Sequence, residues 1–129
     1  MVAKVETTSR HRSKVTNNAV ELLVMSDPFA ENSVVQILRV KLVGNNVVYN
    51  VDRYSVVISD GCHWVHGMLA DRLINNGLIG KLSRNCTVKV LDYATRFVQG
   101  NPIVILLDIE VQSKLKCKIG FPDKYQMNE

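Results

Sequence analysis

Alternating apolar and polar positions at residues 52–69 predict a β-hairpin. A β-branched run leads into the dipeptide Asp60-Gly61, which readily adopts the positive φ values of a tight turn, and a second apolar arm follows. If Tyr54 faces the core, the two-residue period places Arg53 and Ser55 on the opposite, outer face. The hairpin is therefore expected to present a cation on the outside of an antiparallel sheet.

Residues 33–42 show the same period and predict an earlier strand with a basic face. Its apolar and basic side chains are expected on opposite faces, with Leu38, Val40 and Leu42 on one and Arg39 and Lys41 on the other. The segment Gly44-Asn45-Asn46 follows, and its composition predicts that the strand ends there.

A second hairpin is predicted later in the chain. Residues 84–97 alternate again, and the turn Gln99-Gly100-Asn101-Pro102 leads into an apolar strand at residues 103–111. In this last strand four apolar side chains are expected to share the face opposite two acidic ones, namely Ile105, Leu107, Ile109 and Val111 against Asp108 and Glu110.

Two short helices are predicted beside the strands. Residues 16–25 are expected to be helical because Asn18 and Glu21 have the spacing of a capping box, after which apolar residues recur on one face. Residues 71–76 are expected to form a helical turn, and Gly77 follows at the position where a residue in the left-handed conformation would end it.

The order of these elements predicts the fold. Helix, strand, hairpin, short helix and hairpin make a mainly β protein, a five-stranded OB-fold barrel with a short N-terminal helix and a helix between strands 3 and 4. Residues 16–125 would form this one domain. A disordered basic arm is expected at residues 1–15 and a tail at residues 126–129.

The net charge of +4 is distributed unevenly along the chain. Residues 1–14 hold four Lys and Arg side chains against one Glu, so they carry +3 and leave +1 for residues 15–129. Any electropositive surface on the folded part must therefore arise from local clustering of cations. No apolar run approaches the roughly 18 residues of a membrane span, so we expect no membrane contact.

The residues that could perform metal or covalent chemistry do not form a convincing site. On an extended strand Cys62 and His66 would be roughly 13 Å apart at about 3.3 Å per residue, which is too far for one metal ion. The three cysteines lack a C-x-x-C pair, so reduced thiols are expected. Ser59 and Asp60 could suggest a nucleophile and a base, but an aspartate before glycine is the ordinary residue of a hairpin turn, and no third group is present to orient the pair. We expect no metal, no cofactor and no enzymatic activity.

Several short motifs resemble one known family. In chain order they are Val35-Gln36-Ile37-Leu38 with Lys41, Arg53-Tyr54 ahead of Ser59-Asp60-Gly61, His66-Gly67-Met68-Leu69-Ala70, Leu82-Ser83-Arg84-Asn85-Cys86, Ile103-Val104-Ile105-Leu106-Leu107 with Glu110-Val111, and Lys118-Ile119-Gly120. From about Thr16 to Tyr125 the sequence resembles the N-terminal domain of the large subunit of replication protein A, the eukaryotic single-stranded-DNA-binding complex.

The resemblance implies a nuclear OB-fold module that recruits partner proteins in DNA replication, repair and recombination. A basic groove would take acidic amphipathic helices of checkpoint and repair proteins and would bind single-stranded DNA weakly. Other replication protein A subunits would be partners if the chain is part of a longer one. The implied groove positions are Lys41, Arg53, Met68, Ile103 and Ile105. This chain has Ser55 where the family usually has a second arginine. The candidate replacements for that arginine are Arg39, Lys89 and Arg96.

The alternative interpretation is a direct single-stranded nucleic-acid-binding OB-fold protein. Such proteins stack bases on aromatic side chains. The candidates here are Tyr54, Trp64, Tyr93 and Phe97, but only 6% of the residues are aromatic, so most of them are expected in the core.

Overall fold

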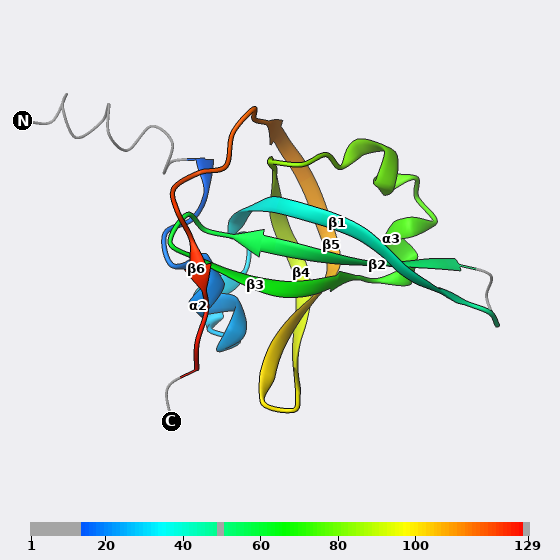
Figure 1. The fold of residues 1–129 in the computed structure, drawn as a ribbon, viewed down its shortest axis with the longest axis horizontal. Coiled ribbons are helices and arrows are strands. Elements are labelled where there is room, and N and C mark those ends of the chain that lie inside the picture. The colour runs from blue at the N-terminus through cyan, green and yellow to red at the C-terminus, as the bar shows by residue number, and fades with distance from the viewer. Residues whose placement is uncertain (1–13, 49–50, 128–129) are drawn as a thin grey trace, which may run out of the picture.

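The computed structural model describes residues 14–48 and 51–127. Within them, the main strands are β1 (Val34–Asn46), β2 (Val51–Ser59), β3 (His63–Leu69), β4 (Cys86–Val98) and β5 (Asn101–Lys114). They pair in the order β1-β2-β3-β5-β4, and β4 pairs again with β1. Only the β3–β5 pair among these five is parallel. The predicted five-stranded OB-fold barrel is confirmed (Figure 1).

Two short α-helices lie toward opposite ends of the barrel (Figure 1). They are α2 (Ala19–Val24), before β1, and α3 (Asp71–Ile74), between β3 and β4, as predicted, and single 3₁₀ turns η2 (Pro28–Ala30) and η3 (Leu78–Lys81) follow them. Helix α2 buries Ala19, Val20, Leu23 and Val24 in the core, whereas α3 buries Leu73. In the described part of the chain, no helix combines the length and apolar character needed to cross a membrane.

The expected basic arm at residues 1–15 falls almost wholly outside the described residues. Val15, at its end, is buried. Thr16 is held to the start of β1, because its backbone N–H donates to the Val34 carbonyl at 2.8 Å and its Oγ1 accepts from the Val34 N–H at 2.9 Å. Residues 128–129 of the expected tail also lie outside the described residues.

The hairpin predicted at residues 52–69 forms as β2 and β3. The two strands are antiparallel, and Gly61 has a φ of +93° in the turn between them. Val56 and Ile58 are buried in the barrel. The alternation therefore turns Arg53 and Ser55 to the outside, as predicted.

Strand β1 contains two β-bulges that its sequence period does not reveal. Its pairing with β2 shifts by one residue at Leu38 and again at Val43. Val35 and Ile37 face the core before the first bulge, and Val40 faces the inner side after it. The predicted grouping of Leu38 with Val40 is therefore wrong, and Leu38 instead lines depressions on the outer surface.

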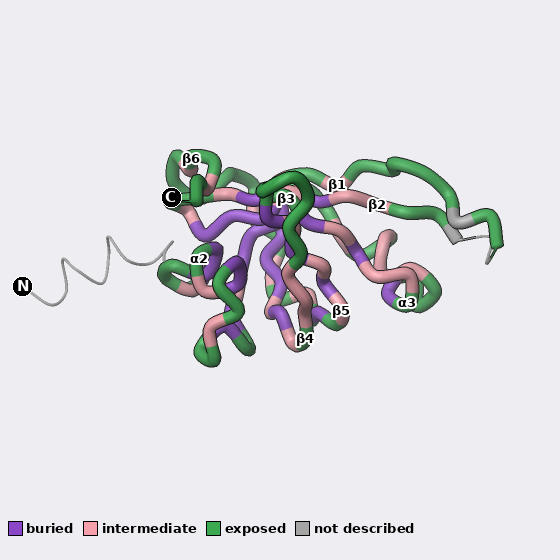
Figure 2. The backbone as a smooth tube through the Cα atoms, turned by 90° about the horizontal axis from the view of Figure 1, so that it is seen from below, coloured by how far each residue is buried: buried purple, intermediate pink, exposed green. Residues whose placement is uncertain are grey.

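The predicted end of the first strand at residues 44–46 is also wrong. These residues continue to pair with β2, and Asn45 Nδ2 donates to Asp52 Oδ1 at 3.0 Å. A partner strand that supplies ladder hydrogen bonds outweighs the weak strand propensity of Gly and Asn. The resulting β1–β2 extension is exposed, with Val47 and Val48 at 85% and 83% exposure, and it projects from the buried centre (Figure 2).

The face predicted for β5 changes partway along the strand. The turn before it has only two residues, Gln99 and Gly100, both with positive φ. The pairing of β4 with β5 then skips Leu107. Val104 and Leu106 are consequently buried before the shift and Ile109 after it. The expectation that Ile105 and Leu107 share the face of Ile109 and Val111 is wrong for this reason.

Residues 115–127 return across the outside of the barrel. The buried Gln36 side chain holds this segment, because Nε2 donates to the carbonyls of Asn85 and Cys117 at 3.0 and 2.9 Å. Its Oε1 accepts from the Ile119 N–H at 2.8 Å. The short strand β6 (Asp123–Lys124) then pairs in parallel with the start of β3.

Candidate binding surface

The outer face of the barrel carries side chains in transverse rows, because directly paired residues point to the same side of a sheet. One row consists of Lys41, Ser55, Met68 and Ile105, on β1, β2, β3 and β5. The adjacent row consists of Arg39, Val57, His66, Ile103 and, on β4, Arg96. All the predicted groove residues except Arg53 and Lys89 lie in these two rows.

Arg53 lies beside the first row, in a shallow groove that we call the Met68 groove. This groove has a volume of about 250 Å³ and is lined by Arg53, Met68, Leu69, Ala70, Asp71 and Ile105. Arg53 Nε lies 3.9 Å from Asp71 Oδ1, with the two side chains 51% and 38% exposed. An ion pair this long and exposed is weak, so the guanidinium can still attract a carboxylate from outside.

Lys89 lies on another part of the barrel. It pairs with Val34 near the start of β1 and with Glu110 on β5. Arg39 lies five positions after Val34 on β1, roughly 17 Å along a strand at about 3.3 Å per residue. The structure therefore separates this candidate from the other predicted groove residues.

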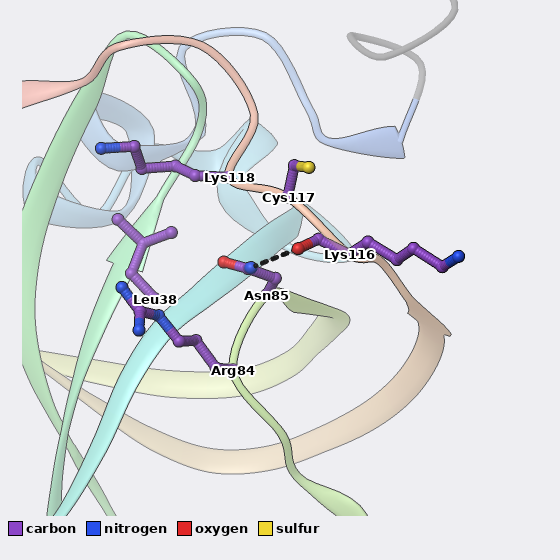
Figure 3. A pocket seen from close by; sticks show the side chains of 6 residues that line it. All are labelled: Leu38, Arg84, Asn85, Lys116, Cys117 and Lys118. Atoms are coloured by element: carbon purple, nitrogen blue, oxygen red, sulfur yellow. Dashed lines mark hydrogen bonds between the residues drawn. The ribbon is translucent and has the colours of Figure 1, made fainter.

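A second concave region centres on the bulged Leu38. Three depressions there share Leu38 and Arg84 in their lining. The one next to the rows measures about 290 Å³ and is lined by Leu38, Arg39, Val57, Trp64, His66, Arg84, Lys118 and Pro122. Arg84 and Lys118 extend to the Leu38 side of this region, whereas Lys116 points away (Figure 3). We call the surface formed by Arg39, Trp64, His66, Arg84 and Lys118 around Leu38 the Leu38 patch.

The Leu38 patch is electropositive. His66 is exposed, but partial burial of its ring lowers its pKa below the ordinary value of 6.5, and the positive charges of Lys124 and Arg39 lower this pKa further. In the ranges that the structure describes, the ion pairs formed are Arg53 with Asp71 and Arg72 with Asp92. The cations of the patch are therefore not neutralised by a neighbouring carboxylate among the described residues.

The sequence matches the family model described as Replication factor-A protein 1, N-terminal domain, over residues 15–114. The chain belongs to this family. A similar protein is a Replication protein A 70 kDa DNA-binding subunit from Arabidopsis thaliana, which is 29% identical over 87 residues. These residues make up 67% of this chain but 14% of the relative, so the chain corresponds to a small part of that protein.

The match confirms the family inferred from the sequence motifs. The OB-fold barrel is thus that of a replication factor-A N-terminal domain, and the name of the Arabidopsis relative describes that protein as a DNA-binding subunit. The match extends from the residue before Thr16 to the last residue of β5. It thus includes both rows of the outer face and excludes the segment that carries Lys118.

Sequence reasoning did not place Arg84, Lys118 and Lys124 in the surface of this replication factor-A domain. Arg84 appeared only as part of a family motif, and Lys118 as part of the family motif Lys118-Ile119-Gly120 near the end of the chain. The bulge at Leu38 and the anchoring by Gln36 bring these positions together. Neither interaction leaves a local pattern in the sequence.

The candidate stacking residues separate into two groups. Tyr54 and Tyr93 pack against the core, and burial raises the pKa of Tyr93. Trp64 is half-buried in the lining of the Leu38 patch, and Phe97 is exposed near the β4–β5 turn. Trp64 is therefore the candidate that lies beside cations.

The histidines contact aromatic rings. His63 packs edge-on against Tyr125 with ring centroids 5.8 Å apart, and His66 against Trp64 at 5.2 Å. Across residues 14–48 and 51–127, no three His, Cys, Asp or Glu side chains are grouped in a way that could hold a metal ion.

Proposed function

We propose that this domain recruits partner proteins in DNA replication, repair and recombination by binding their acidic amphipathic segments on its outer face. Weak binding of single-stranded DNA, a nuclear location and a non-catalytic role are parts of the same proposal. If the chain is part of a longer large subunit, association with the other replication protein A subunits follows.

The row formed by Lys41, Ser55, Met68 and Ile105 supports this proposal most directly. Met68 and Ile105 are half-buried and form an apolar strip, while Lys41 and the nearby Arg53 are exposed cations. An acidic amphipathic helix has the matching distribution, with apolar side chains on one face and carboxylates beside them. Its carboxylates would make charge-assisted hydrogen bonds with Lys41 and Arg53.

Ser55 occupies the centre of the row, between Lys41 and Met68. A serine at this position contributes no charge, so the surface needs cations from adjacent positions to hold an acidic ligand. Arg39 is available on the same face of β1 in the next row, and Arg96 on the far side of that row. We propose these two as the replacements, in preference to Lys89.

Charge reversal tests the recruitment role. We expect Arg53→Glu and Lys41→Glu each to weaken binding of a labelled acidic amphipathic helix by about 1–3 kcal/mol, measured by fluorescence anisotropy. Both side chains are exposed, so the fold should survive, which circular dichroism would verify. The matched control is Lys89→Glu, which changes the net charge equally on another part of the barrel.

Two results would argue against this role. Unchanged dissociation constants for Arg53→Glu and Lys41→Glu, in folded variants, would remove the Met68 groove from the mechanism. An equal loss for Lys89→Glu would attribute the binding to net charge.

For single-stranded DNA we expect a dissociation constant in the non-specific range of about 10⁻⁴ to 10⁻⁶ M. The logarithm of the affinity should fall with the logarithm of the salt concentration at about −0.7 per phosphate neutralised. Deleting residues 1–14 removes +3 of the total charge of +4, so it should flatten this slope and leave acidic-helix binding nearly unchanged.

A further inference from the structure

The Leu38 patch is assembled from segments that are distant in the sequence. Arg39 comes from β1, Arg84 from the loop before β4, and Lys118 from the segment after β5. The bulge at Leu38 interrupts the pairing of β1 with β2, and this same residue lines all three depressions. The cations surround a common concave surface.

Hydrogen bonds of the backbone fix the position of the last segment. Beyond the contacts of Gln36, the Asp123 N–H donates to the Cys62 carbonyl at 2.9 Å and the Tyr125 N–H to the Trp64 carbonyl at 2.8 Å. This pairing places Lys124 over the Trp64 ring, with Nζ 5.9 Å from the ring centroid. The patch is therefore a supported surface of the fold.

The charge of the Leu38 patch differs from that of the Met68 groove. Within the described residues, Arg39, Arg84 and Lys118 line the 290 Å³ depression and no carboxylate does, whereas Asp71 lines the Met68 groove beside Arg53. The lowered pKa of His66 is consistent with this excess of positive charge. A ligand with closely spaced negative charges fits the patch better than it fits the Met68 groove.

The aromatic content of the patch narrows the chemistry of the ligand. Trp64 lines the depression with the His66 ring nearly perpendicular to it, and the surrounding lining is apolar or cationic. Proteins that bind single strands combine cations that follow the phosphates with aromatic rings that stack bases. An acidic helix needs an apolar strip as well, and the row through Met68 and Ile105 provides that strip.

We propose that single-stranded nucleic acid binds at the Leu38 patch, with its phosphates on Arg39, Arg84 and Lys118 and a base against Trp64. This inference rests on the weak DNA binding of the proposed function and centres it on Arg84, Lys118 and Trp64, with Arg39 shared with the surface for the acidic helix. The two contacts are adjacent, because His66 and Met68 are two residues apart on β3. Short ligands are needed to resolve them.

The test uses the full 129-residue chain, a short labelled oligothymidine and a labelled acidic amphipathic helix in parallel titrations. We expect Arg84→Glu and Lys118→Glu each to weaken oligothymidine binding at least about fivefold at low salt and to reduce the salt slope by about 0.7. Lys89→Glu, with the same change in charge, should alter this affinity by less than about twofold. The acidic helix should bind both patch variants almost as it binds the unmodified chain.

A separate variant tests the stacking contact. Trp64→Leu should weaken oligothymidine binding by about 5-fold to 150-fold, the range found when a stacked aromatic ring is removed. Because Trp64 is half-buried, circular dichroism must first show that this variant is folded. If Trp64→Leu does not fold, Arg84→Glu and Lys118→Glu decide the proposal, because the Arg84 and Lys118 side chains are exposed.

Several outcomes would overturn the proposal. They are no oligothymidine binding by the unmodified chain, unchanged affinity in both Arg84→Glu and Lys118→Glu, or a loss confined to Arg53→Glu. Loss of acidic-helix binding in Arg84→Glu would also overturn it, by making the patch a protein-docking surface. If the acidic helix does not bind the unmodified chain while oligothymidine binding depends on Arg84, recruitment fails and this inference stands.

Discussion

The Asp60 carboxylate caps helix α2 through Val20, which lies forty residues earlier in the chain. Asp60 Oδ2 accepts a hydrogen bond from the Val20 N–H at 3.0 Å. Its other oxygen accepts from the N–H groups of Cys62 and His63, each at 2.9 Å, within the β2–β3 turn. Asn18, at the N-cap, has a φ of 61° and makes no capping bond with its side chain. The predicted capping box at Asn18 is therefore wrong, and a buried turn residue stabilises the helix instead.

Asp60→Asn should lower the free energy of unfolding by about 1–3 kcal/mol. The carboxylate uses both of its oxygens to accept hydrogen bonds from three backbone N–H groups, whereas an amide side chain has only one oxygen that can accept. Urea denaturation measures this loss. Asn18→Gly is the control, since glycine adopts a positive φ without steric cost and no capping bond is removed. A loss for Asn18→Gly equal to that for Asp60→Asn would contradict the assignment of the cap.

Asp71→Asn should strengthen binding of an acidic helix by up to about fivefold, because Asp71 competes for Arg53 across an exposed ion pair. Anisotropy titration measures the change. Asp92→Asn is the matched control, since it removes a carboxylate from the exposed Arg72 pair, which does not line the Met68 groove. Equal strengthening by both variants would show an effect of net charge only.

The stability of the domain should fall as the pH drops below about 6.5, partly because of His66. Its pKa is lowered in the folded state by burial, then by Lys124 and Arg39, so the unfolded chain takes up the proton first and is favoured at low pH. Urea denaturation from about pH 7.5 to 5.5 should show a smaller fall for His66→Gln than for the unmodified chain.

Nuclear magnetic resonance provides a direct check on His66. The free protein should titrate at this residue below 6.5, and oligothymidine should raise the pKa because a nearby phosphate stabilises the imidazolium. A value at or above 6.5 in the free protein would contradict the electropositive character of the patch.

Gln36→Leu should destabilise the domain by about 1–3 kcal/mol, because it leaves the backbone groups of Asn85, Cys117 and Ile119 without their partner. Amide hydrogen exchange at Ile119 should become much faster, and oligothymidine binding should weaken as Lys118 loses its support. The control is Ser113→Ala, which removes the 2.7 Å hydrogen bond with Thr87 and leaves the Gln36 contacts in place. Unchanged exchange at Ile119 in Gln36→Leu would show that other contacts hold this segment.

The order of elements and much of the outer face follow from the sequence alone. The two-residue period sets Arg53 and Ser55 opposite Val56 and Ile58, because successive side chains of a strand point to opposite sides wherever pairing is regular. Turn chemistry is equally local, as the positive φ of Gly61 illustrates. These are properties of a few adjacent residues.

The positions at which that period is interrupted depend on the folded chain. The bulges at Leu38 and Leu107 require the partner strand and closure of the barrel, and each reverses the faces of the residues beyond it. At Gly67 a Cβ atom would lie 2.6 Å from the Val104 carbonyl oxygen, so the parallel β3–β5 contact that closes the barrel leaves no room for a side chain there.

Long-range hydrogen bonds determine how the N-terminal helix and the C-terminal segment are held against the barrel. Asp60 reaches Val20, and Gln36 reaches Cys117 and Ile119, because a buried polar group must find a partner in the folded chain. Such a partner can lie at any sequence separation. The Leu38 patch is built from contacts of this kind, whereas the row through Met68 follows the alternation of strands that the sequence itself displays.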